Sequence, residues 1–141
     1  MSDQKPIQRT LRLRQETADR LEAEAARGAE SANALADRLL LEGLRALEHP
    51  LIQFRTGASG DREPHLVGTR LKVRDVIHTA REHHGDLAQT AGYFDIAVPL
   101  VEAAVAYYSD FTEEIDQAME EATAFAERQR RRWEHQRQLL A

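Results

Sequence analysis

The sequence predicts a mainly α-helical protein in which one N-terminal strand and one small β-hairpin accompany the helices. Two patterns support this prediction: residues 7–14 alternate between apolar and polar, and most later apolar residues recur at helical spacing. His49-Pro50 marks a junction, because proline disfavours helix at the residue before it. We therefore expect three sections, residues 1–48, 49–109 and 110–141.

Composition restricts the class of protein. The 141-residue chain is 30% charged and contains no cysteine, which fits a folded, helix-rich protein without disulfides or thiolate metal sites. Residues 1–5 are polar and lead into no apolar stretch, so we expect no signal peptide. No apolar run is long enough to span a bilayer, and we expect a cytoplasmic protein with no membrane partner.

The first section combines one strand with two helices. Apolar side chains occupy alternate positions of the strand (Ile7, Leu11, Leu13), and polar ones occupy the positions between them (Gln8, Thr10, Arg12, Arg14). A helical stripe from Ala18 to Ala25 stops at Gly28, and Ser31 can cap a second helix. That helix carries a face of leucines (Leu35, Leu39, Leu40, Leu44, Leu47). Because so short a section cannot build its own core and its strand has no partner, we expect an obligate dimer.

The run Gln8-Arg9-Thr10-Leu11-Arg12-Leu13, with the Gly28–Ser31 turn and the leucine-rich second helix, resembles the ribbon-helix-helix family of Arc-, CopG- and ParD-type repressors. In that family two strands, one from each subunit, form a ribbon that enters the major groove. The resemblance implies a homodimer or higher even-numbered oligomer on double-stranded operator DNA. It implies that Gln8, Thr10 and Arg12 read base edges, and their donors and acceptors suit adenine, thymine and guanine.

Charge and helix position suggest the phosphate contacts. Although the net charge is -5, the segment from Lys5 to Arg14 holds four basic residues and no acid. Lys5, Arg9 and Arg14 are therefore candidates for attracting phosphates. Ser31 and Asn33 begin the second helix, where backbone N–H groups favour a phosphate oxygen. The simpler alternative is an amphipathic edge strand followed by an ordinary helix cap.

The middle section is expected to form a hairpin and three helices. Ile52–Phe54 and His65–Val67 are the candidate strands, joined by a loop that contains Gly57, Gly60 and Pro64. The expected helix positions are a stripe of buried residues (Val73, Val76, Ile77, Ala80), a capping Asp86, Pro99 in a first turn, and inward residues of the last helix (Val101, Ala104, Val105, Tyr108).

The stretch from Pro64 to Val73, with Asp75-Val76 and the Ala-rich ending at Tyr108, resembles a bacterial family catalogued as domain of unknown function 433. That family is often found in antitoxins beside PIN-like toxins, and the two resemblances together suggest a VapB-type antitoxin. Its hairpin is usually tighter than the loop from Arg55 to Glu63 suggests. The last two helices of this section resemble a helix-turn-helix, but their surface lacks the basic donors that a recognition helix needs.

The third section reads as one amphipathic helix. Asp110 followed by Glu113 suggests a capping box, and an apolar stripe follows (Phe111, Ile115, Met119, Ala122, Phe125, Ala126). The residues that we expect to bind a toxin lie further on (Phe125, Arg130, Arg131, Arg132, Trp133). An arginine there can pair with carboxylates that hold Mg²⁺ in a ribonuclease. The alternative is a solvated helix packed within its own chain.

These expectations combine into an antitoxin that neutralises a PIN-like ribonuclease toxin and represses its own operon. The six histidines form no metal signature, and no catalytic motif is present, so we expect no cofactor, no metal and no enzyme activity. Two other functions remain open. One is a stand-alone repressor whose C-terminal half oligomerises or senses a ligand, and the other is an assembly protein whose basic strand is only an edge strand.

Overall fold

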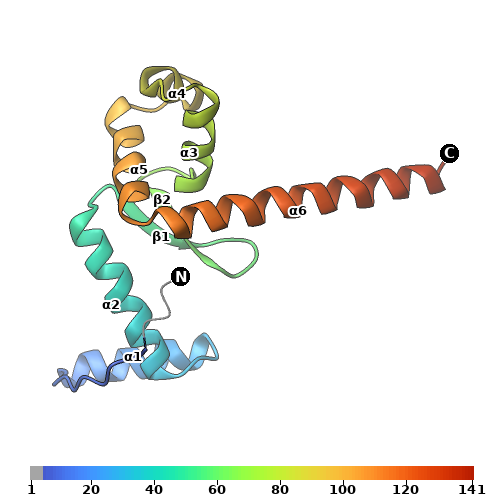
Figure 1. Cartoon of the computed structure of the whole chain (residues 1–141). Helices are drawn as coiled ribbons and strands as arrows, with labels where there is room; N and C mark the ends of the chain where they lie inside the picture. Colours follow the sequence, from blue (N-terminus) through green and yellow to red (C-terminus); the bar gives the residue numbers. More distant parts are fainter. Residues whose placement is uncertain (1–4) are drawn as a thin grey trace. The chain divides into compact units, whose positions relative to one another are not determined.

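The computed structural model describes residues 5–141, which leaves residues 1–4 of the predicted first section outside the described residues. Across the described part the chain is mainly helical, with one two-stranded antiparallel sheet (Figure 1). In chain order the elements are α1 (Gln15–Arg27), α2 (Ala32–Glu48), β1 (Ile52–Thr56), β2 (Arg62–Leu66), α3 (Val73–Glu82), α4 (Leu87–Phe94), α5 (Val98–Asp110) and α6 (Thr112–Leu139). The chain divides into two compact units, residues 1–50 and 51–141. The division falls directly after His49-Pro50, and α6 belongs to the second unit.

In the first unit α1 and α2 meet through a tight turn. The backbone N–H of Glu30 donates to the Ala25 carbonyl at 3.1 Å, and Ala29 takes a left-handed conformation with φ 52°. Ser31 then caps α2, because its Oγ accepts from the Ala34 N–H at 3.1 Å as predicted. Among the described apolar residues of this unit only Ala25 and Leu35 are buried.

The hairpin of the second unit is tighter than expected. The strands pair from Ile52 with Leu66 to Thr56 with Arg62, so Arg55 and Glu63 belong to the strands and not to the loop. Pro64 likewise lies within β2, opposite Phe54. The expectation of a long loop was wrong because backbone pairing continues along an exposed ribbon that has no apolar alternation to signal it.

Helices α3, α4 and α5 pack with the hairpin around one core. The stripe predicted for α3 is buried throughout, and Asp86 caps α4 by accepting from the Gln89 N–H at 2.9 Å. In α5 the inward face differs from the prediction: Val105 is exposed and Tyr108 half-buried, whereas Tyr107 is fully buried. Tyr107 takes the inner position because its ring lies against those of Phe54 and Phe111.

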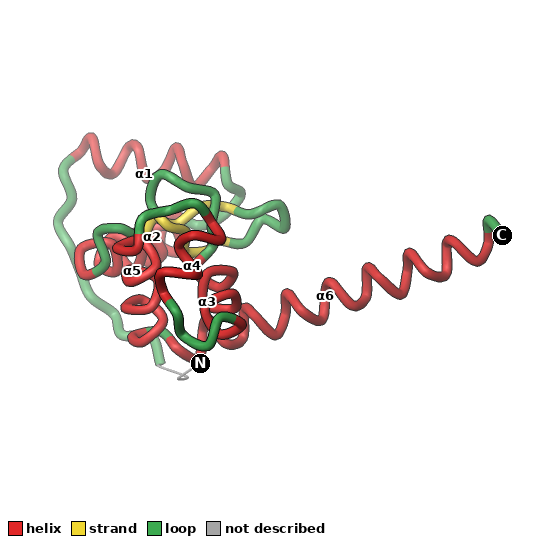
Figure 2. The backbone as a smooth tube through the Cα atoms, turned by 90° about the horizontal axis from the view of Figure 1, so that it is seen from above, coloured by secondary structure: helices red, strands yellow, loops and turns green. Residues whose placement is uncertain are grey.

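The start of α6 also differs from the prediction. Asp110 is the last residue of α5, and Phe111 is the N-cap of α6 without a side-chain hydrogen bond, so no capping box forms there. Ile115 anchors the first turns of α6 in the core. Beyond Ala122 every residue is exposed, and α6 runs out past the other helices of its unit (Figures 1 and 2).

We expect Leu66→Ala to lower the free energy of unfolding of the second unit by about 2–5 kcal/mol, because Leu66 is fully buried and its removal leaves a cavity. Urea unfolding followed by near-ultraviolet circular dichroism of the tyrosines measures this change, since all three tyrosines lie in this unit. The neighbouring Val67→Ala is the control: its side chain is exposed, and the change should stay within roughly 1 kcal/mol. Equal losses in the two variants would contradict the assigned core.

Candidate functional site

The N-terminal segment from Lys5 to Arg14 is exposed at every residue and forms no regular secondary structure in the single chain. The strand predicted for residues 7–14 is therefore absent from the chain taken alone. Its physical reason is that a strand needs a neighbour to accept and donate its backbone hydrogen bonds, and none of the described strands pairs with this segment. The backbone is nevertheless extended where the segment meets α1, since Arg14 has φ -64° and ψ 148°.

All the predicted DNA-contacting side chains of this segment are accessible. They are the base-reading candidates Gln8, Thr10 and Arg12 and the phosphate candidates Lys5, Arg9 and Arg14. The first acid after them, Glu16, pairs with Arg20 at 2.8 Å within α1. The positive charge of the segment is therefore not opposed by a neighbouring carboxylate, which favours an anionic partner.

The start of α2 is the second part of this region. The Ser31 hydroxyl already accepts the cap hydrogen bond, but its own O–H remains available as a donor. Asn33 lies exposed in the first turn, and that turn contains no acidic residue. A helix start of this kind favours an anion, and the acid that lies nearest, Glu30, is held by Arg38 at 2.7 Å.

The leucine face of α2 is open in the single chain. Of the predicted face only Leu35 is buried, while Leu39, Leu40, Leu44 and Leu47 are all exposed. The apolar residues of the N-terminal segment, Ile7, Leu11 and Leu13, are exposed as well. So many apolar side chains exposed in one small unit indicate a surface that another protein surface covers.

Helix α6 carries all five residues that were predicted to bind a toxin, and all five are exposed. The helix does not bring them to one face. At 100° per residue Arg130, Arg131 and Arg132 point in three directions, so a single flat surface cannot contact them all. Phe125 and Arg132 share one side, and Trp133 continues the line of Ala122 and Ala126. The alternative of a helix packed throughout on its own chain is wrong beyond Ala122.

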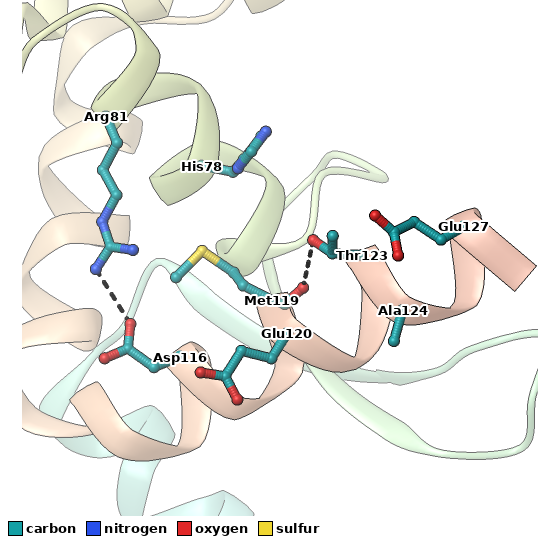
Figure 3. A pocket seen from close by; sticks show the side chains of 8 residues that line it. All are labelled: His78, Arg81, Asp116, Met119, Glu120, Thr123, Ala124 and Glu127. Carbon is teal, nitrogen blue, oxygen red and sulfur yellow. Dashed lines mark hydrogen bonds and ion pairs between the residues drawn. The ribbon is translucent and has the colours of Figure 1, made fainter.

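The structure also contains a groove that sequence reasoning missed. It has a volume of about 550 Å³ and lies between α3 and α6, lined by His78, Arg81, Asp116, Met119, Glu120, Thr123, Ala124 and Glu127 (Figure 3). Arg81 pairs with Asp116 at 3.1 Å, although the two are 35 positions apart in the chain. No local pattern signals such a pair, because only the packing of α3 on α6 brings it together.

Tyr108 completes this cluster. Its hydroxyl donates to Asp116 Oδ1 at 2.7 Å, while Arg81 donates to the hydroxyl oxygen and lies over the ring. Burial, together with the hydrogen bond to Asp116, raises the pKa of Tyr108 above its ordinary value. The neutral phenol thus stabilises the fold below the ordinary pKa, and this contribution is lost as the pH rises through the raised pKa of the folded state.

We expect Asp116→Asn to lower the pKa of Tyr108, because the substitution removes the negative charge that favours the neutral phenol. An ultraviolet absorbance titration of the phenolate measures the shift, and Tyr108→Phe assigns the transition to this residue. Glu120→Gln, which lines the same groove, is the matched control and should leave the curve unchanged. A titration of Tyr108 that is the same in the Asp116 and Glu120 variants would contradict the assignment.

The helices α4 and α5 have little to offer nucleic acid. Neither helix contains a lysine or arginine, and α5 exposes Glu102. His83 on α3 bonds to Thr90 on α4 through Nδ1 and Oγ1 at 3.2 Å, which fixes the angle between these helices. These observations agree with a packing role for the trihelical part and leave residues 5–14 as the strongest candidate for contact with DNA.

No helix within residues 5–141 combines the length and the apolar character needed to cross a membrane. Comparison of the chain with protein-family models, with curated proteins and with solved structures returned no match. The functional argument therefore rests on the residues and their geometry.

Proposed function

We propose that this protein is the antitoxin of a type II toxin–antitoxin system, in which two copies bind operator DNA through their N-terminal units and α6 holds a toxin. One observation carries the proposal: an exposed, basic and acid-free segment, residues 5–14, leads directly into a helix pair whose leucine face is open. Both features are explained at once if two copies assemble as a ribbon-helix-helix dimer.

In that dimer the two segments 7–14 pair as antiparallel strands and gain the backbone partners that one chain lacks. Ile7, Leu11 and Leu13 then turn toward the helices, where they meet the leucines of α2. Each methylene-sized increment removed from water contributes roughly 0.8 kcal/mol, so a face of this size can stabilise the dimer substantially.

The opposite side of the ribbon carries Gln8, Thr10 and Arg12 into the major groove. Arg12 is suited to guanine and Gln8 to adenine, since each side chain can make two hydrogen bonds to one base. Lys5, Arg9 and Arg14 contact phosphates beside the ribbon, and Ser31 and Asn33 hold a phosphate at the start of α2. The net charge of -5 is compatible with this interface because the positive charge is local.

The toxin is expected on α6, whose outer half contacts nothing else in its unit. A PIN-like ribonuclease would present clustered carboxylates, and the arginines at 130–132 are suited to pair with them. Phe125 and Trp133 would supply the apolar anchors, both being more than half exposed. A groove-shaped partner that surrounds the helix fits the three directions of the arginines better than a flat one.

A stand-alone repressor is the second candidate. The groove between α3 and α6 favours it, because a polar cavity of about 550 Å³ is large enough for a small ligand. Such a protein would bind the same DNA but would need no toxin. A toxin gene next to this one, or a co-purifying ribonuclease, distinguishes the two candidates.

We expect Arg12→Ala to weaken specific operator binding by about 1–3 kcal/mol while the dimer stays folded, because a guanine contact is lost. Fluorescence anisotropy with the DNA upstream of the gene measures the affinity, and sedimentation measures the dimer. Arg20→Ala is the matched control, since Arg20 is equally exposed but pairs with Glu16 on α1. If the double variant Thr10→Ala, Arg12→Ala keeps the parent's operator affinity, this assignment fails.

We expect deletion of residues 126–141 to abolish toxin neutralisation and to spare operator binding, because the deleted part is exposed and distant in sequence from the DNA-binding unit. Growth of cells that co-express the toxin measures neutralisation. A full-length chain with Arg132→Ala and Trp133→Ala should behave like the deletion, whereas His135→Ala with Gln138→Ala should neutralise normally. Neutralisation by the truncated chain would show that the toxin binds elsewhere.

A further inference from the structure

The outer half of α6 continues a line of residues that its inner half already uses for packing. Ile115 and Met119 lie on this line and pack in the core of the second unit. The line continues with alternating steps of four and three residues through the α6 seam, which we define as Ala122, Ala126, Gln129, Trp133, Gln136 and Leu140. All of the α6 seam beyond Ala122 is exposed, including Trp133 at 58% and Leu140 at 84%.

Charge along α6 is divided between its halves. Residues 112–127 contain six acids and no base, whereas residues 128–141 contain five arginines and one glutamate. Two α6 helices laid side by side in opposite directions therefore bring the acidic half of each against the basic half of the other. A parallel pair would bring the arginine clusters together and would be opposed by their repulsion.

We propose that the outer half of α6 pairs antiparallel with α6 of a second copy of this chain, with Trp133 of one helix against Ala122 of the other. This register sets the largest side chain of the α6 seam opposite a small one, and it sets Ala126 opposite Gln129. It also brings Asp116 near Arg137 and Phe125 near Arg132, which are a favourable ion pair and a favourable cation–π pair.

The groove between α3 and α6 supports the same pairing. Three carboxylates line it, those of Asp116, Glu120 and Glu127, and only Asp116 among them is already joined to Arg81 in this groove (Figure 3). In the antiparallel register the arginine-rich end of the second helix arrives beside this groove. The acidic lining is thus matched to the segment that would lie next to it.

This inference goes beyond the proposed function, because it needs neither DNA nor toxin. It does bear on that function: a toxin that binds the α6 seam must first separate the two helices. Pairing through α6 is also distinct from pairing through the leucine face of α2, so the two contacts are tested separately.

The absence of cysteine from the chain permits a direct test by single-cysteine variants of the full-length protein, treated with a short bis-maleimide. Gln129 lies beside the twofold axis of the proposed pair, so two copies of its side chain are separated by only about 4–5 Å along the helices. Gln136 lies farther out, and its two copies are about 25 Å apart. Arg131 is near the axis but faces outward. All three positions are exposed, so the substitutions should leave the fold intact.

We expect Gln129→Cys to give a covalent dimer in high yield, and Gln136→Cys and Arg131→Cys to give little. Adding Trp133→Ala to Gln129→Cys should lower the yield severalfold, whereas adding His135→Ala should not. Efficient linkage at both Gln129 and Gln136 would mean a parallel pair and would overturn the proposal. Linkage at Gln129 no greater than at Arg131 would overturn it too, even where sedimentation shows a dimer, because that dimer would then be formed by the first unit.

Discussion

Residues 5–50 carry more large apolar side chains than one copy of this unit can bury. Helices α1 and α2 bury only Ala25 and Leu35 among their apolar residues, while most leucines of α2 stay in contact with water. Conformational entropy lost on folding must be offset by burial, and two helices alone provide too little of it. This constraint makes self-association the central question for the unit, and it links the stability of the unit to its proposed grip on DNA.

The second unit solves the same problem within one chain. Its core closes around Tyr107, whose ring contacts Phe54 from the hairpin and Phe111 from the corner between α5 and α6. The Tyr107 hydroxyl donates to Glu114 at 3.2 Å, so the same residue also fixes the first turn of α6. Because hairpin, α5 and α6 share this residue, α6 leaves the unit in a direction set by the core.

Local patterns predicted much of this fold because they reflect local physics. The spacing of Val73, Val76, Ile77 and Ala80 identifies a buried helix face, and Ser31 and Asp86 act as the caps that their positions indicate. Features that depend on contacts distant in sequence were not predictable in this way. Tyr107 rather than Val105 faces the core because of residues on other elements, and the groove with Arg81 and Asp116 exists only through packing. The strand of residues 7–14 depends on a chain that the sequence of one copy does not describe. The three adjacent arginines of α6 look like one cluster in the sequence, yet the helix turns them to different sides.

The exposed outer half of α6 has an energetic consequence for the chain. Its helical state depends on backbone hydrogen bonds, a few ion pairs such as Arg130 with Glu134, and basic residues placed toward the C-terminal end of the helix dipole. Isolated helices of this length are only marginally stable in water, so local opening of α6 is least costly at the tip and most costly beside Ile115. Amide hydrogens along this helix therefore exchange with solvent in a graded series. Any partner that covers the tip also supplies the free energy that keeps it helical.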